Sequence, residues 1–147
     1  MRWILGLLVV GIVFALTFFR FAPHDVDAVH TAAAPQGVGD IETPNSFRAV
    51  RQFTTPTEEM LRAVDLVIAK TPRTVRLAGR VEDGLISYVT RSAVFGFPDY
   101  TTVWIDGDGP HLNISSRARF GLSDVGVNKA RIKDWLAQLG PLIVAPE

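Results

Sequence analysis

The feature that most constrains this chain is an apolar run near its N-terminus, residues 3–19, which contains no charged side chain. The run is 17 residues long, and a helix of roughly 17 to 25 apolar residues spans a bilayer. Arg2 and Arg20 bracket the run, and its terminal aromatic residues, Trp3 and Phe19 among them, are typical of membrane interfaces. Residues 1–21 are therefore predicted to form a transmembrane anchor, with the membrane as a partner.

Two other interpretations of this run are less favoured. Ala32-Ala33-Ala34 has the small-residue pattern of a signal-peptide cleavage site, but it lies about fifteen residues beyond the run. Signal peptides are normally cut much closer to their apolar region. A buried soluble helix would have to be covered on all sides, and nothing else in the chain could cover so uniform a surface. We therefore expect an uncleaved single-pass anchor.

The charges beside the anchor indicate its orientation. Arg20 is followed by Asp25 and Asp27, with no second basic residue until Arg48, whereas Arg2 and the terminal amine lie at the other end. Positive charge is enriched on the cytoplasmic side of membrane helices, so this distribution favours a cytoplasmic N-terminus. We predict an inner-membrane protein whose C-terminal domain lies in the periplasm.

The composition excludes several classes of function. The 147 residues include 15 Lys and Arg against 15 Asp and Glu, so the charge balance does not indicate a nucleic-acid partner. The chain has no cysteine, which removes thiol nucleophiles, thiolate metal sites and disulfides. No cluster of His, Asp and Glu has a recognised metal or catalytic spacing, so the sequence predicts neither a metal nor a cofactor.

The segment after the anchor is expected to be a linker. Residues 22–45 contain three prolines, two glycines, five alanines and four acids, and show neither helical nor strand periodicity. This composition is typical of a flexible tether. We therefore predict three parts, which are an anchor over 1–21, a tether over 22–45 and one folded domain over 46–147.

Two helices are expected in the folded domain. Thr55, Pro56 and Glu58 form the pattern of a capping box with proline in the first turn. The second helix covers roughly 127–139 and ends at Gly140. Each helix has an apolar stripe, formed in the first by Met60, Leu61, Val64, Val67 and Ile68 and in the second by Ile132, Trp135, Leu136 and Leu139.

Four strands are expected between these helices, over 74–81, 85–91, 100–105 and 110–118. Short glycine-containing turns between consecutive strands favour antiparallel hairpins. The predicted fold class is α+β, with the anchor followed by a helix, a four-stranded antiparallel meander and a helix in two layers. Two short helices cover one face of the sheet, so the other face must be solvated or bound to something.

Three motifs resemble a known family. They are Pro44-Asn45-Ser46, the segment 95–99 with the sequence Phe-Gly-Phe-Pro-Asp, and the block 117–129. Over roughly residues 44–139 the chain resembles the bacterial and plastid family called Domain of Unknown Function 1499. Its final pattern is matched by Arg119, Gly121, Ser123, Asp124, Gly126, Asn128, Arg131 and Ile132. Ala118 and Tyr100 depart from the pattern, where many members have a serine and an acid. The resemblance implies a fold and a place near membranes, and it implies no activity.

This last block also contains the main candidate site. A helix N-terminus with Arg119 beside it is suited to a carboxylate or a phosphate. The alternative, which we favour, is that Ser123, Asp124 and Asn128 cap the last helix while the arginines pair with Asp99 or Asp124. Arg119 is then expected to bridge the end of a strand to the turn before that helix.

A second candidate surface lies on the strand 100–105. Tyr100, Thr102 and Trp104 point to one side of this strand. If that side is the one without helices, exposed aromatic side chains beside Arg117 would suit a protein partner. Packing of Trp104 in the core is the alternative interpretation.

These candidates favour binding over catalysis. A calcium loop starting at Asp106 would end at Arg117, where a glutamate is needed, and no serine has the surroundings of a catalytic triad. The leading prediction is a non-catalytic accessory or binding module in an exported compartment, associated with a membrane-protein complex. The alternative is an enzyme or ligand-binding protein that uses Arg119, Asp99 and Asp124 on an anionic small molecule.

Overall fold

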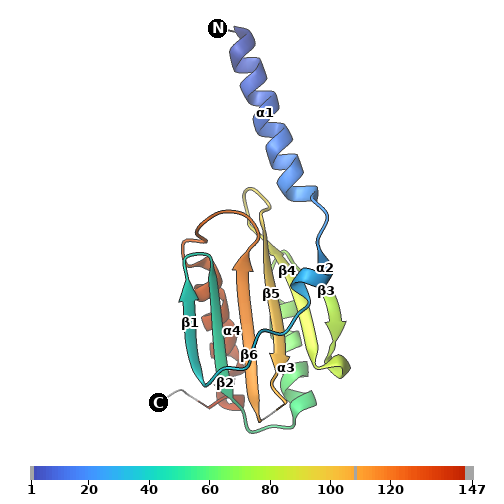
Figure 1. The fold of residues 1–147 in the computed structure, drawn as a ribbon, viewed down its shortest axis with the longest axis vertical. Coiled ribbons are helices and arrows are strands. Elements are labelled where there is room, and N and C mark those ends of the chain that lie inside the picture. Colours follow the sequence, from blue (N-terminus) through green and yellow to red (C-terminus); the bar gives the residue numbers. More distant parts are fainter. Residues whose placement is uncertain (1, 108, 145–147) are drawn as a thin grey trace.

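A computed structural model of the chain describes residues 2–107 and 109–144 (Figure 1). The first helix, α1 (Arg2–Phe21), stands away from the rest of the molecule, and none of its described residues is buried. Its length and apolar composition are sufficient to cross a membrane. The sequence prediction of an N-terminal apolar helix is therefore confirmed, and both a membrane anchor and a signal sequence have this form.

A six-stranded antiparallel sheet forms the body of the described domain. Its strands lie in the order β1-β2-β6-β5-β4-β3. The strands β3 to β6 form the meander that the sequence predicts, with a short 3-10 helix, Val81–Asp83, between β3 and β4. The strand bounds are β1 Gly39–Thr43, β2 Ser46–Gln52, β3 Thr74–Arg80, β4 Leu85–Arg91, β5 Pro98–Ile105 and β6 His111–Ala118.

Two strands, β1 and β2, are additional to the predicted four, so a four-stranded meander is wrong as a description of the sheet. β2 pairs with β6 along its whole length, with Ser46 opposite Arg117 and Gln52 opposite His111. β1 pairs with β2 and forms an edge of the sheet. Pairing with β6 satisfies the backbone groups of β2, and this contact between distant segments is not visible in local sequence.

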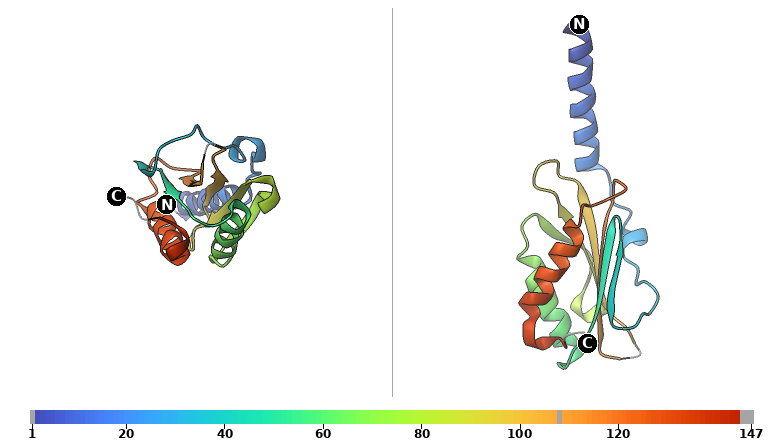
Figure 2. Two further views of the ribbon diagram at one scale, coloured as in Figure 1. Left: turned by 90° about the horizontal axis from the view of Figure 1, so that it is seen from below. Right: turned by 90° about the vertical axis from the view of Figure 1, so that its left-hand side faces the viewer.

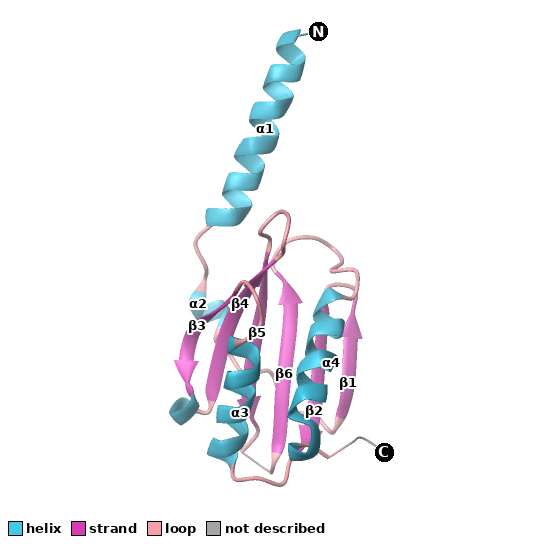
Figure 3. Ribbon diagram, turned by 180° about the vertical axis from the view of Figure 1, so that it is seen from behind, coloured by secondary structure: helices cyan, strands magenta, loops and turns pink. Residues whose placement is uncertain are grey.

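Two helices cover one face of the sheet (Figure 3). They are α3 (Thr57–Ala69) and α4 (Val127–Leu139), and the bounds of α4 agree with the sequence prediction. The main core lies between these helices and the sheet, and both predicted apolar stripes contribute to it. The largest fully buried side chains of this core include Trp135, Tyr88, Phe47, Met60, Leu61, Ile68, Ile86, Leu112, Ile114 and Ile132.

The predicted capping box at the start of α3 is wrong. Pro56 is the N-cap residue and has no side chain that can accept a hydrogen bond there. The hydroxyl of Thr55 donates instead to the sulfur of Met60 at 3.8 Å. Pro56 has φ of −55° and ψ of 144°, which is not helical, so α3 begins at Thr57, one residue later than the motif predicts.

The other face of the sheet carries residues 22–38, which we call the covering segment (Figure 2). It includes the short helix α2 (Val26–Val29) and lies on the opposite side of the sheet from α3 and α4. The predicted tether over 22–45 therefore differs from the structure, which places the covering segment and β1 there. The molecule has a third, partial layer in addition to the two that the sequence predicts.

Candidate functional site

The covering segment buries the aromatic side chains that β5 presents on this face. Tyr100 is 5% exposed and Trp104 is 3% exposed. The expectation that these rings stay exposed for a protein partner is therefore wrong, because the chain's own covering segment takes that place. Val29 packs with Tyr100 and Val89 in a small apolar cluster separate from the main core.

Arg119 holds the start of the covering segment. Its Nη1 donates to the carbonyl oxygen of Ala22 at 3.1 Å, and its Nη2 donates to that of Pro23 at 2.8 Å. The predicted pairing of Arg119 with Asp99 or Asp124 is therefore wrong, because the covering segment brings two carbonyl groups to the end of β6. This arginine ties the domain to the residues that directly follow α1.

His24 forms a second attachment of the covering segment. Nη2 of Arg91 lies 3.2 Å from Nε2 of His24, and Nδ1 of His24 lies 2.9 Å from the hydroxyl of Tyr100. A guanidinium can only donate, so Nε2 accepts and the neutral ring carries its proton on Nδ1. Burial, together with the charges of Arg91 and Arg119, lowers the pKa of His24 and so favours this neutral form.

Val29 and His30 hold the middle of the covering segment. The hydroxyl of Thr102 donates to the carbonyl oxygen of Val29 at 3.0 Å, and Nδ1 of His30 lies 3.0 Å from Oγ of Ser87. The His30 ring lies against Gly79, where an added Cβ atom would come within 2.6 Å of the ring. Glycine at this position therefore leaves the space that the ring occupies.

Arg48 holds the covering segment near its end. Nη1 of Arg48 donates to the carbonyl oxygen of Ala34 at 3.0 Å, and Nη2 donates to Oδ1 of Asn113 at 2.5 Å. The guanidinium also lies 4.7 Å from the centre of the Trp104 ring. Attachments from Arg119 to Arg48 therefore follow the covering segment across the sheet.

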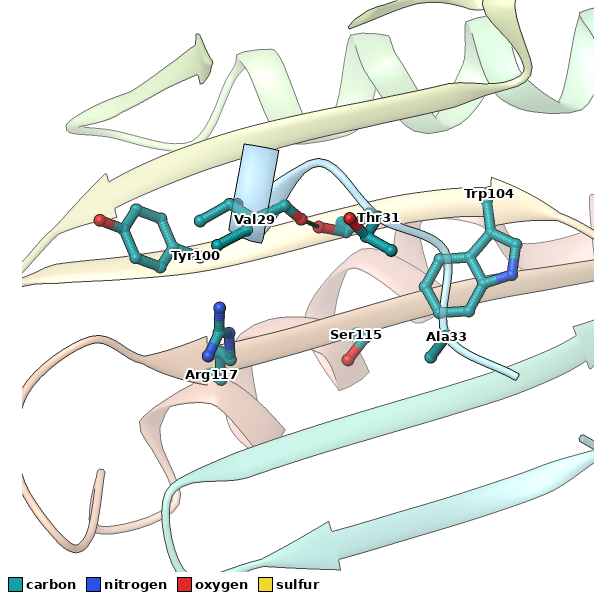
Figure 4. Close-up of a pocket in the computed structure, with 9 residues that line it drawn as sticks. Val29, Thr31, Ala33, Tyr100, Trp104, Ser115 and Arg117 are labelled. Atoms are coloured by element: carbon teal, nitrogen blue, oxygen red, sulfur yellow. Dashed lines mark hydrogen bonds between the residues drawn. The ribbon is translucent and has the colours of Figure 1, made fainter. Parts of the chain in front are cut away.

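A cavity of about 320 Å³ lies between the covering segment and the sheet (Figure 4). Tyr100 and Arg117 lie at one end of it and Trp104 at the other, while Ser115 lies between them on β6. This volume is at the lower end of the range for small-molecule sites, so a small ligand fits it. The lining is formed by Ala28, Val29, Thr31, Ala33, Tyr100, Thr102, Trp104, Ser115 and Arg117.

Arg117 is the charged group of this cavity. It is exposed, and its guanidinium lies 5.9 Å from the centre of the Tyr100 ring. Within the described residues, the ion pairs are formed by other arginines and by Lys129, and Arg117 takes part in none. The guanidinium is therefore available to an anion from outside the chain.

The described lining of the cavity is suited to binding rather than to proton transfer. Its polar side chains are the guanidinium, the tyrosine, the indole of Trp104 and the hydroxyls of Thr31, Thr102 and Ser115, and it includes no His, Asp or Glu. General acid–base catalysis in enzymes uses these three residue types most often. The arrangement can hold an anionic group next to aromatic and aliphatic surfaces.

A second polar cluster lies between β5, β6 and α4. Nη2 of Arg131 lies 3.0 Å from Oδ2 of Asp99, and both side chains are mostly buried. Oδ1 of Asn128 accepts from Ser116 at 2.7 Å and from Arg131 at 2.8 Å, while its Nδ2 has no partner among the described residues. Burial raises the pKa of Asp99, and the charge and hydrogen bond of Arg131 oppose this rise.

Asp124 and Ser123 order the turn before α4. Asp124 accepts from the amides of Gly126 and Asn128, each at 3.0 Å, and Ser123 Oγ accepts from the amide of Val125 at 3.1 Å. The N-cap residue of α4 is Gly126, so of the three predicted capping residues only Asp124 reaches an amide in the first turn of the helix, whereas Asn128 is a buried part of the second cluster. A smaller cavity of about 180 Å³ is lined by Asp99, Ser123 and Asp124, among others.

The predicted site residues therefore fall in three places. Arg117 and Trp104 line one cavity, Arg119 binds the covering segment, and the remaining candidates lie near the start of α4, namely Asp99, Ser123, Asp124 and Asn128. Sequence reasoning missed the roles of His24, His30 and Ser115. The sequence offers one signal for the roles of the two histidines. Two of the three histidines in the chain fall in the predicted tether.

A known family matches most of the chain. The family described as "Protein of unknown function (DUF1499)" matches residues 21–139, and a comparison with curated proteins found no match. The matched residues begin at the end of α1 and end at the last residue of α4, so they include the covering segment and all six strands. They also contain the three motifs on which the resemblance was recognised. The chain therefore belongs to the DUF1499 family.

Proposed function

We propose that this protein is a membrane-anchored, non-catalytic binding module whose ligand is a small molecule with a carboxylate or phosphate group. The observation that carries the proposal is Arg117, an exposed guanidinium at one end of a cavity whose described lining has no acidic group. Arginine binds such anions through two parallel N–H bonds, which fix their orientation as well as their charge. The hydroxyl of Ser115 and the ring of Tyr100 are the neighbouring contacts.

The competing proposal is an enzyme that uses Arg119, Asp99 and Asp124, and it has less support. Arg119 donates to the covering segment, Asp99 pairs with Arg131, and Asp124 accepts two amides at the start of α4. A catalytic site would need these groups to converge on a substrate. Each of them is instead engaged in holding the fold.

The contacts of the covering segment support an uncleaved anchor. Cleavage at 32–34 would remove His24, Val29 and His30, and with them the groups that bury Tyr100 on the sheet. The family match begins at residue 21, which makes this segment part of the family's domain. We therefore propose that α1 stays attached and spans the membrane.

We propose that the domain lies in the periplasm, on the charge distribution around α1. Protease added to intact spheroplasts should then remove the domain, because this orientation exposes it on the outer side of the inner membrane. Immunoblotting with an antibody to the domain measures the loss. A domain that is protected in spheroplasts but digested in inverted membrane vesicles would show the opposite orientation.

Removal of the Arg117 guanidinium should abolish binding of small anions. With the full chain in detergent micelles, the probes are inorganic phosphate, glycerol 3-phosphate, acetate and hexanoate. A ligand at about 100 times its Kd adds about 2.7 kcal/mol to the free energy of unfolding, which raises the Tm by roughly 8 °C. We expect this rise from at least one probe in the native protein and none in Arg117→Gln.

The matched control for this experiment is Arg62→Gln. Arg62 is an exposed arginine on α3 that pairs with Glu58 and lies outside the cavity lining. Arg62→Gln removes one positive charge, as Arg117→Gln does, but leaves the cavity unchanged. This variant should therefore keep the ligand-induced rise in Tm. The proposal is wrong if Arg117→Gln responds to the probes as the native protein does, or if no probe stabilises the native protein.

A further inference from the structure

The end of the domain beside α1 exposes large apolar side chains on two loops. These loops are residues 92–97, between β4 and β5, and residues 119–126, between β6 and α4. Outside α1, the three most exposed large apolar residues described are Leu122 at 92%, Val125 at 90% and Val94 at 78%. All three lie on these loops, so the most exposed apolar side chains of the domain gather at one end.

The loop 92–97 reaches the level of the last turn of α1, and the loop 119–126 lies just below that level (Figures 1 and 2). The Phe19 ring lies 5.2 Å from the ring of Phe97 and 4.7 Å from that of Phe120, measured between ring centres. Phe19 belongs to the apolar run, and two further residues of helix rise only about 3 Å. If α1 spans a bilayer, the loop residues that touch Phe19 are at the depth of the membrane interface.

The backbone of the second loop presents its apolar tip outward. Val125 has φ of +54°, a left-handed conformation that β-branched residues rarely adopt. The hydrogen bonds of Ser123 and Asp124 to the following amides hold the turn in this shape. Val125 is almost fully exposed, so contacts within the described domain do not compensate for its strained backbone. We therefore expect its stabilising contact to come from outside the domain.

The charged groups at this end are suited to lipid phosphates. Arg20, Arg91 and Arg119 all lie near the junction of α1 and the loops, where Arg91 donates to the carbonyl of Gly96 and Arg20 packs against the same glycine. The acids here are already engaged, because Asp99 pairs with Arg131 and the carboxylate of Asp124 accepts from the amides of Gly126 and Asn128. Basic side chains beside exposed apolar and aromatic ones are typical of segments that lie in a membrane interface.

We propose that loops 92–97 and 119–126 form a second membrane contact, inserting Val94, Leu122 and Val125 into the lipid leaflet that holds the C-terminal end of α1. This inference rests on the proposed membrane anchoring of α1 and goes beyond it, because an anchor alone leaves the domain free to stand away from the bilayer. The partner is a lipid surface rather than a protein. The apolar groups are isolated loop tips at the end of the domain beside α1, and such tips suit a fluid interface.

The chain has no cysteine, so single cysteines can be introduced and spin-labelled without other changes. The test variants are Val94→Cys and Leu122→Cys, in the full chain reconstituted into phosphatidylcholine and phosphatidylglycerol vesicles. We expect their nitroxides to be several-fold more accessible to oxygen than to a water-soluble nickel chelate. Glu82→Cys is the water-exposed control, because residue 82 follows β3 at the opposite end of the sheet, roughly 20 Å away along β4.

A further control, Val13→Cys in the middle of α1, separates failure of this inference from failure of the anchor. If the label at residue 13 is in lipid while those at 94 and 122 are as water-accessible as that at 82, the anchor stands and the loop contact is wrong. If the label at residue 13 is also in water, the anchoring proposal fails as well. Labels that are shielded in native membranes but exposed to water in these vesicles, which contain no other protein, would identify a protein partner and overturn the proposal.

Discussion

Replacing Arg131 with alanine should lower the free energy of unfolding by about 3 to 5 kcal/mol, the cost of leaving one member of a buried ion pair without its partner. Arg131 and Asp99 are both mostly buried, and their closest atoms are 3.0 Å apart. The substitution also removes the hydrogen bond from Arg131 to Asn128. Thermal melting of the full chain in detergent should show a fall in Tm of roughly 10 °C or more.

Two further variants distinguish loss of the ion pair from a general effect of removing an arginine. Adding Asp99→Asn to Arg131→Ala removes the buried negative charge and should restore part of the lost stability. Arg119→Ala removes hydrogen bonds to two carbonyl groups and a contact with the Phe120 ring at a partly exposed site, so it should cost about 1 to 2 kcal/mol. If Arg131→Ala costs no more than Arg119→Ala, the role assigned to the buried pair is wrong.

Trp135→Ala should be as damaging, with a loss of about 3 to 5 kcal/mol in the free energy of unfolding. Trp135 is 1% exposed in the main core, and its indole N–H donates to the hydroxyl of Thr71 at 2.8 Å. Alanine leaves a cavity between α4 and the rest of the core, which the surrounding side chains fill only in part. Urea unfolding of the full chain in detergent, followed by circular dichroism, measures the loss.

Trp135→Phe is the control for the core volume. It keeps an aromatic ring in the same place and loses the hydrogen bond to Thr71, so it should cost clearly less than alanine, about 1 to 2 kcal/mol. An alanine variant as stable as the phenylalanine variant would mean that α4 does not depend on this side chain for its packing.

Local periodicity was sufficient to predict the elements that contact neighbours in the chain. The apolar stripe of α4 and the alternation along β6 identified the residues that face the main core, because each pattern records one buried face. The hairpins of the meander followed from short turns between adjacent strands. These features depend on interactions between residues close together in the chain, and such interactions leave a pattern that can be recognised in a single sequence.

Contacts between distant residues were not visible in the same way. β1 has two acids and a threonine among its five residues and lies at the sheet edge, so it lacks the apolar pattern of an inner strand. His24 and His30 bind side chains 76 and 57 residues later in the chain. Their segment has the composition of a tether, but the structure places it in contact with the sheet.

The candidate site shows the same limit. Arg119 was the favoured arginine because it matches the family's final pattern, yet its partners are backbone carbonyl groups, which any residue supplies. Arg117 is two residues earlier on the same face of β6, where the cavity depends on the covering segment above it. Without the position of that segment, nothing in the sequence separates the two arginines by function.

The proposed binding cavity and the proposed position of the domain at the membrane both require residues 22–38 to be bound to the sheet. Amide hydrogen exchange over residues 26–34, measured by mass spectrometry on the full chain in detergent micelles, tests this most directly. An isolated four-residue helix has no stability of its own, so any protection must come from docking on the sheet. Val29→Ser removes a buried contact of this segment, and Val26→Ser is the matched control at an exposed position of the same helix.

We expect exchange about 100-fold slower than in a free peptide of the same sequence, which corresponds to an opening free energy of about 2.7 kcal/mol. Val29→Ser should lose most of this protection, and Val26→Ser should keep it. Exchange of the native protein at the rate of the free peptide would mean that residues 22–38 are a loose tether, and would contradict both the cavity and the fixed position of the domain.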